Sequence, residues 1–124
     1  MMRRILAAAC LVAAAMTVVV GCLVRPGPVT AHGAGTRYAV TLTIDGTGTA
    51  DIVVDRGGAD EVVVSATMPQ MGHATPEEAA QRVEPGHFRA VGDLFPMSGV
   101  WEVAVRVRGN AGEEVIPLTV LVAS

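Results

Sequence analysis

The run Trp101-Glu102-Val103-Ala104-Val105-Arg106-Val107-Arg108 has the most regular pattern in the chain. Large apolar side chains alternate with smaller or charged ones, and a period of two residues is typical of a β-strand with one buried face. Trp101 and three valines share that face. This run therefore predicts a sheet with one side packed against a core and the other side open to solvent.

The same period of two recurs on both sides of this run, in residues 37–44, 61–67 and 87–91. Residues 50–54 form a shorter strand. Residues 114–123 form a last one with apolar residues on both faces, as in a buried strand, although Pro117 within it suggests an edge or a bulge.

Turn signals separate these strands at fairly regular intervals, among them Asp45-Gly46 and Gly57-Gly58. Thr75-Pro76-Glu77-Glu78 has the form of a helix start, from which at most two turns can follow. Six short strands with so little helix indicate an all-β fold, an immunoglobulin-like antiparallel β-sandwich of six to seven strands. An open Greek-key barrel would give the same pattern.

The N-terminal part has the organisation of an export signal. Two arginines precede the uncharged apolar run from Ile5 to Val20, and Gly21-Cys22 follows it. Val19-Val20-Gly21-Cys22 also resembles the lipobox of bacterial lipoproteins. This resemblance implies that residues 1–21 are a lipoprotein-type signal peptide and that Cys22 is the lipid attachment site. Counted on to Val24, the run also has about the 20 residues needed to cross a bilayer, so an uncleaved anchor is the alternative. Both interpretations place the domain in the cell envelope, on the outer side of the cytoplasmic membrane.

Residues 22–36 hold two prolines and several glycines with few apolar residues, a composition that predicts a flexible tether with His32 as a solvated linker residue. The domain itself then spans residues 37–124, enough chain for one small core.

Composition argues against several classes of function. Every basic residue is an arginine, and beyond residue 21 seven of them stand against twelve acidic residues. Without a basic cluster we expect no nucleic-acid binding. Only Cys10 and Cys22 are cysteines, so the domain has neither a disulfide framework nor a thiolate metal site. We do not expect an enzyme, because no serine or cysteine nucleophile lies near a histidine in a recognisable motif.

A candidate metal site lies in Met68-Pro69-Gln70-Met71-Gly72-His73, with Met97 in a second irregular segment. Thioether and imidazole donors favour Cu(I) over hard ions. Two of these residues, Met68 and Met97, also have an explanation as core-packing residues. Met68 continues the inward phase of residues 62–66, and Met97 shares the parity of Trp101.

Met71 and His73 lie beyond Pro69, outside any periodic face, so core packing does not account for them. His87 opens a strand whose next residue, Phe88, takes the inward side, and we expect its side chain to face the surface.

Three stretches, residues 68–73, 85–90 and 95–103, resemble the YtkA-like family, which is related to FixH-like proteins. The most specific markers are the MP-x-MGH and M-x-G-x-W runs, and the resemblance extends over residues 37–122. It implies a small exported immunoglobulin-like domain, often lipid-anchored or fused to membrane proteins, and associated with copper handling or oxidase assembly. By motif position, it implies Met68, Met71, His73 and Met97 as candidate ligands.

The sequence therefore predicts a membrane-anchored module that carries Cu(I) and delivers it to a membrane protein such as a copper transporter or an oxidase. The alternative is a metal-free structural or interaction domain that assists a membrane-protein complex. The copper hypothesis requires that the loops carrying Met71, His73 and Met97 meet.

Overall fold

The alternating segments form antiparallel strands in the computed structural model, which describes residues 28–123. The predicted signal over residues 1–21 and Cys22 lie outside the described residues. The strands are β1 (Val29–Ala34), β2 (Ala39–Ile44), β3 (Ala50–Arg56), β4 (Ala59–Met68), β5 (His73–Ala74), β6 (Glu78–Ala79), β7 (Gln81–Glu84), β8 (His87–Ala90), β9 (Gly99–Gly109) and β10 (Gly112–Val122). A single 3-10 turn, Pro69–Met71, follows β4.

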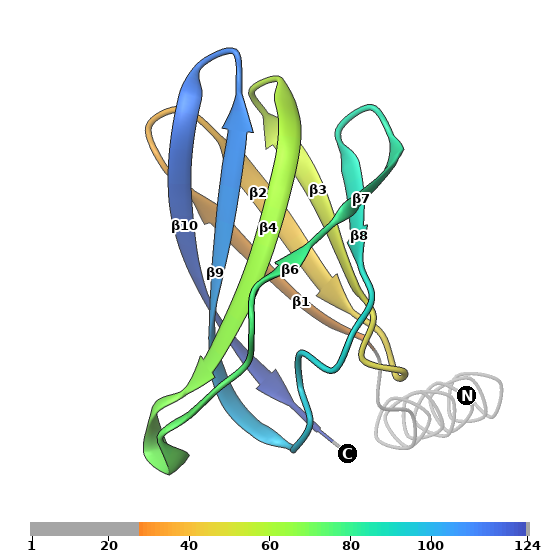
Figure 1. The fold of residues 1–124 in the computed structure, drawn as a ribbon, viewed down its shortest axis with the longest axis vertical. Coiled ribbons are helices and arrows are strands. Elements are labelled where there is room, and N and C mark those ends of the chain that lie inside the picture. The colour runs from red at the N-terminus through yellow and green to blue at the C-terminus, as the bar shows by residue number, and fades with distance from the viewer. Residues whose placement is uncertain (1–27, 124) are drawn as a thin grey trace, which may run out of the picture.

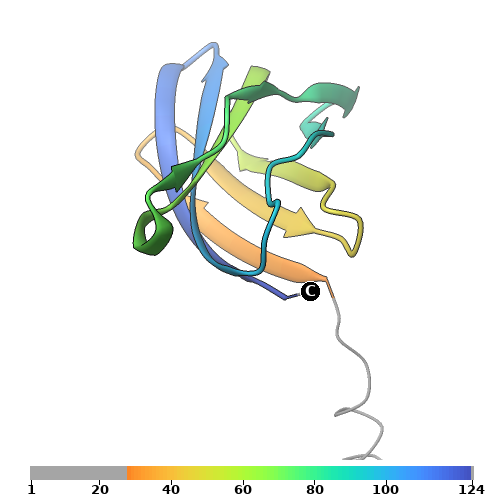
Figure 2. The same ribbon diagram turned by 60° about the horizontal axis from the view of Figure 1, so that its bottom comes forward.

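The strands form two sheets that face each other (Figures 1 and 2). One sheet has the order β1-β2-β3-β8-β7, and the other has the order β10-β9-β4-β5 with β6 also paired to β4. This arrangement confirms the predicted all-β antiparallel sandwich. Two separate sheets, each with its own edges, also distinguish it from the barrel that the sequence pattern left open.

The core lies between the sheets and consists of the inward residues that the alternation predicted. Tyr38, Val62, Phe88 and Trp101 are fully buried or nearly so, as are the apolar residues two positions further along their strands. Burying one such large side chain contributes about 1.5–3 kcal/mol relative to leaving it exposed. The described residues include no buried polar or charged side chain, so packing of apolar side chains dominates the interior.

The expectation of a flexible tether over residues 22–36 is wrong for Val29–Ala34, which form β1. This strand pairs with β2 along its whole length, from Val29 opposite Ile44 to Ala34 opposite Ala39. The sequence did not reveal it because its residues are small or polar, so the strand is fixed by pairing with a neighbour rather than by burying large side chains. The domain therefore begins before residue 37.

The expectation of a short helix starting at Thr75 is also wrong. The chain runs beside β4 instead, where the N–H of Thr75 donates to Ala66 O at 2.9 Å and that of Ala80 donates to Val62 O at 2.9 Å. Between these bonds, Glu78 and Ala79 form β6 against β4. A capping pattern is a local preference, and here hydrogen bonding to a neighbouring strand outweighs it.

The last strand, β10, is an edge strand rather than a buried one. It pairs only with β9 in its sheet, and Val115 and Leu121 on its outer face are exposed, while Ile116, Leu118 and Val120 point into the core. The interpretation of Pro117 as an edge residue is therefore confirmed. Proline has no N–H to donate, and an edge strand needs hydrogen bonds on one side only, so proline is tolerated there.

Candidate metal site at the loop end of the sandwich

The candidate ligands lie at one end of the sandwich, which we call the loop end. It comprises the turn at residues 45–49, the segment at residues 69–74 and the loop at residues 91–98, together with the end of β10. Figure 1 shows these segments at the bottom of the molecule, and Figure 2 brings that end forward. The sheets thus supply a rigid base for three irregular segments, the usual setting for a binding site.

The first of these segments reverses direction around Gly72. Pro69 begins the 3-10 turn, and Gly72 takes a left-handed conformation with φ of 61°, its N–H donating to the carbonyl of Pro69 at 3.2 Å. Glycine adopts that conformation without steric cost. Met71 is therefore at the tip of the turn, where 67% of it is exposed.

His73 returns from this turn to pair with the end of β4, directly opposite Met68. Opposite residues of an antiparallel pair project to the same face of the sheet, and Met68 projects inward. The exposed imidazole of His73 accordingly lies edge-on to the indole of Trp101, with 6.0 Å between ring centroids and an interplanar angle of 76°. His73 thus covers the end of the core above Trp101.

The loop at residues 91–98, which connects β8 of one sheet to β9 of the other, contacts the same indole. Phe95 packs edge-on to Trp101, with 5.8 Å between centroids. The indole N–H of Trp101 donates to the carbonyl oxygen of Met97 at 3.0 Å, and the Met97 residue remains 39% exposed. The segment with His73 and the loop with Met97 therefore both contact one fully buried side chain.

Met68 differs from the other candidates because it is buried in the core. A Cβ added at Gly99 would lie 2.8 Å from the terminal methyl of Met68, so this side chain fills the space against the β9 backbone. The packing interpretation therefore describes Met68 well. Met71, His73 and Met97 remain exposed at the loop end.

Trp101 is the residue whose role sequence reasoning missed. It was assigned to the core from its alternation with Val103, and it is fully buried, yet it also links the two segments of the candidate site. The Met-x-Gly-x-Trp run at residues 97–101 could have indicated this link, because it places Trp101 four residues after the candidate ligand Met97. The chain has a single tryptophan, so its fluorescence reports on this one location.

A shallow pocket of about 230 Å³ lies beside Met97. The turn at residues 45–48 forms one wall, residues 95–98 form another, and Val122 and Ala123 complete it. Asp45 shapes the turn by accepting hydrogen bonds from the hydroxyl and N–H of Thr47 and from the N–H of Thr49. The hydroxyl bond from Thr47 is the main reason that the pKa of Asp45 lies below its ordinary value.

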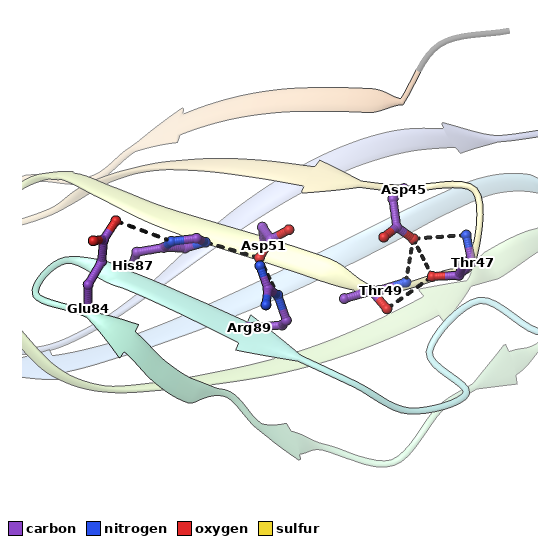
Figure 3. A network of polar contacts seen from close by, with 7 residues as sticks. All are labelled: Asp45, Thr47, Thr49, Asp51, Glu84, His87 and Arg89. Carbon is purple, nitrogen blue, oxygen red and sulfur yellow. Dashed lines mark hydrogen bonds and ion pairs between the residues drawn. The ribbon is translucent and has the colours of Figure 1, made fainter.

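A polar network lies on the outer face of β3 and β8 (Figure 3). Asp51 Oδ1 lies 3.0 Å from Nε2 of His87 and 2.8 Å from Nε of Arg89. Glu84 Oε1 is 3.7 Å from the other ring nitrogen of His87. His87 faces outward as expected, and its neighbours hold it on this face. Among the described residues, no group of three or more His, Cys, Asp or Glu side chains could hold a metal ion.

Within residues 28–123, no helix has the length and apolar character needed to cross a membrane. Comparisons of the chain with protein-family models, with curated proteins and with solved structures found no match. The resemblance to the YtkA-like family therefore stays a prediction drawn from the motifs.

Proposed function

We propose that this protein is a membrane-anchored, extracytoplasmic metal-binding module that carries Cu(I) at the loop end and passes it to a membrane protein. The observation that carries the proposal is the shared contact with Trp101. His73 packs against the indole ring and Met97 receives the indole hydrogen bond, so the two segments are tied to a common base.

The donor chemistry fits the metal. Met71 and Met97 supply thioethers and His73 supplies an imidazole, and such soft and borderline ligands suit Cu(I). All three residues are exposed at the same end of the domain, where an ion can enter and leave. Met68 lies beneath His73 as a core residue, and the proposal does not depend on its sulfur.

Titration of the domain from residue 28 onward with Cu(I) in the presence of a competing chelator tests the proposal. This segment contains every strand that the structure describes and no cysteine, which removes thiolate binding from the measurement. We expect one Cu(I) per domain, with a change in Trp101 fluorescence at the same equivalence point. The double variant Met71→Ala/His73→Ala should lose binding.

His32→Ala is the matched control, because His32 lies on the outer face of β1, where its Nδ1 is 2.9 Å from the hydroxyl of Thr41. That variant should bind Cu(I) as the parent does. The proposal is wrong if no stoichiometric binding occurs, or if the double variant binds as tightly as the parent.

A metal-free interaction domain is the second candidate function, and the exposed apolar side chains at the loop end favour it. In that case Met71→Ala/His73→Ala would weaken partner binding equally with and without a Cu(I) chelator. A partner that is lost only when copper is removed would instead support copper carriage.

A further inference from the structure

The exposed aliphatic side chains of this domain are unevenly distributed. Among the described residues, eight large hydrophobics are exposed, and five of them lie at the loop end: Met71, Val91, Met97, Val100 and Leu121. Single exposed apolar residues are normal, but a concentration at one end marks a contact surface. Methionine suits such a surface because its flexible thioether adapts to different partners.

Val100 and Leu121 are the residues of this surface that lie on paired strands, since they are direct partners across β9 and β10. They are 44% and 64% exposed on the outer face of the sheet. The pocket beside Met97 lies on the same end. At about 230 Å³, it is below the roughly 300 Å³ at which small-molecule sites begin, so a side chain projecting from a partner fits it better than a free ligand.

The chain enters the sandwich at this same end. β1 starts at Val29, opposite Ile44 at the edge of the pocket, and Figures 1 and 2 show the start of β1 and the end of β10 close to the loops. Only six residues lie between Cys22 and Val29, and the seven residue-to-residue steps from one to the other span at most about 25 Å when fully extended. If Cys22 carries the lipid, the loop end lies near the membrane surface, whereas the opposite end lies roughly 35 Å further away along the 11-residue strands.

The charges at the loop end favour a protein over the lipid surface itself. Residues 45–49, 69–74 and 91–101 contain no lysine or arginine, while Asp45 and Asp93 are exposed acidic residues there. Surfaces that settle on a bilayer present clusters of basic and aromatic residues to the headgroups. The loop end has the exposed His73 and the half-buried Phe95, with Arg89 near Asp45, and these residues form no basic cluster. A partner with an apolar projection flanked by basic side chains would match the loop end.

We infer that the loop end docks onto the outer face of an integral membrane protein, with Val100 and Leu121 in the contact and the pocket receiving an apolar side chain. This inference rests on the membrane anchoring in the proposed function and names the partner surface of that same site. Copper held by Met71, His73 and Met97 would then face its recipient directly.

A photo-cross-linking amino acid introduced into the full chain at Val100 or Leu121, in cells that make the protein, tests the inference. Val115 is the matched control, because it is 55% exposed on the outer face of the same strand but near the opposite end. We expect adducts with one integral membrane protein, identified by mass spectrometry, from positions 100 and 121 but not from 115. The purified partner should bind Leu121→Glu at least tenfold more weakly than the parent chain, and Val115→Glu as the parent.

Adducts with lipid or with a second copy of the chain would overturn the inference, as would the absence of adducts or equal yields from position 115. The same cross-linking with His73→Ala and a Cu(I) chelator separates docking from copper carriage. If the adduct persists and the protein is found not to bind copper, the docking inference holds and the proposal of copper carriage is wrong. If the protein binds copper but forms no adduct, the proposal of copper carriage holds and the docking inference is wrong.

Discussion

The indole N–H of Trp101 donates a 3.0 Å hydrogen bond to the carbonyl oxygen of Met97, four residues earlier in the chain. The bond fixes the backbone at Met97 relative to the buried side chain of Trp101. Since His73 packs on the same indole, the position of Trp101 sets how the two segments of the candidate site lie relative to each other.

Trp101→Phe should keep an aromatic ring in the core and lose this bond. We expect unfolding to become easier by about 1–3 kcal/mol, because the Met97 carbonyl loses its partner. Under the proposed function, Cu(I) affinity should fall as well, since the hydrogen bond no longer holds the loop that carries Met97. Urea denaturation followed by circular dichroism measures the first effect, and competition titration measures the second. If neither the free energy of unfolding nor the Cu(I) affinity changed, the hydrogen bond from Trp101 would have no role in positioning Met97.

Gly99→Ala should destabilise the domain through Met68. Gly99 has φ of 140°, and a Cβ there would lie 2.8 Å from the Met68 methyl group, so both the backbone and the core must shift. We expect a loss of about 1–3 kcal/mol, as for other overpacked sites. Gly46→Ala is the control, because nothing lies within 4 Å of its added Cβ. Equal denaturation midpoints for the two variants would contradict this account.

Gly33→Val tests whether β1 belongs to the domain. A side chain at Gly33 would collide with those of Leu118 and Ile116 on β10, so a loss of about 1–3 kcal/mol is expected from overpacking. In a flexible tether the same substitution would be close to neutral. Thermal or urea unfolding of the chain from residue 28 onward distinguishes the two outcomes.

Glu114 predicts how stability depends on pH. Its carboxylate accepts hydrogen bonds from the backbone N–H groups of Thr36, Arg37 and Tyr38 and from the Thr36 hydroxyl, so it fixes the turn between β1 and β2. Burial raises the pKa of Glu114, but the bonds from Tyr38, Thr36 and Arg37 outweigh it, and the net pKa lies below its ordinary value of 4.5.

A carboxylate whose pKa is lower in the folded state stabilises the fold above its unfolded pKa, and this stabilisation is lost as the pH falls through the folded value. Glu114→Gln should therefore be less stable than the parent at pH 7, and the difference should narrow below about pH 4.5. Denaturant unfolding at a series of pH values measures it. Glu113→Gln is the neighbouring control, since the Glu113 carboxylate makes exposed ion pairs with Arg106 and Arg108, which contribute little. A difference between Glu114→Gln and the parent that stays constant with pH would contradict the assignment.

The fold followed from the sequence wherever large side chains alternate. The phases of Tyr38, Val62, Phe88 and Trp101 were predicted correctly, because burying such side chains decides which face of a strand points inward. β1 and β6 escaped prediction because backbone pairing with β2 and β4 holds them, and an isolated sequence pattern does not record such partners.

For the candidate residues, the sequence predicted which are buried but not how their segments lie in space. Alternation placed Met68 in the core and left Met71 and His73 outside it, as the structure does. The link through Trp101 could not be predicted, since it joins residues from different strands and depends on how β5 folds back against β4. Prediction from sequence therefore separated the buried Met68 from the exposed Met71 and His73, whereas the shared contact with Trp101 required the three-dimensional fold.

Pro117 bears on how copies of this protein behave when they are crowded together. It lies near the middle of β10, the edge of its sheet, opposite Ala104 of β9. A strand from a neighbouring copy that added to this edge would find no N–H donor there, and its ladder would stop after a few bonds. The domain can therefore be held at high local density, with apolar side chains exposed at the loop end, while this long edge resists growth into extended sheets.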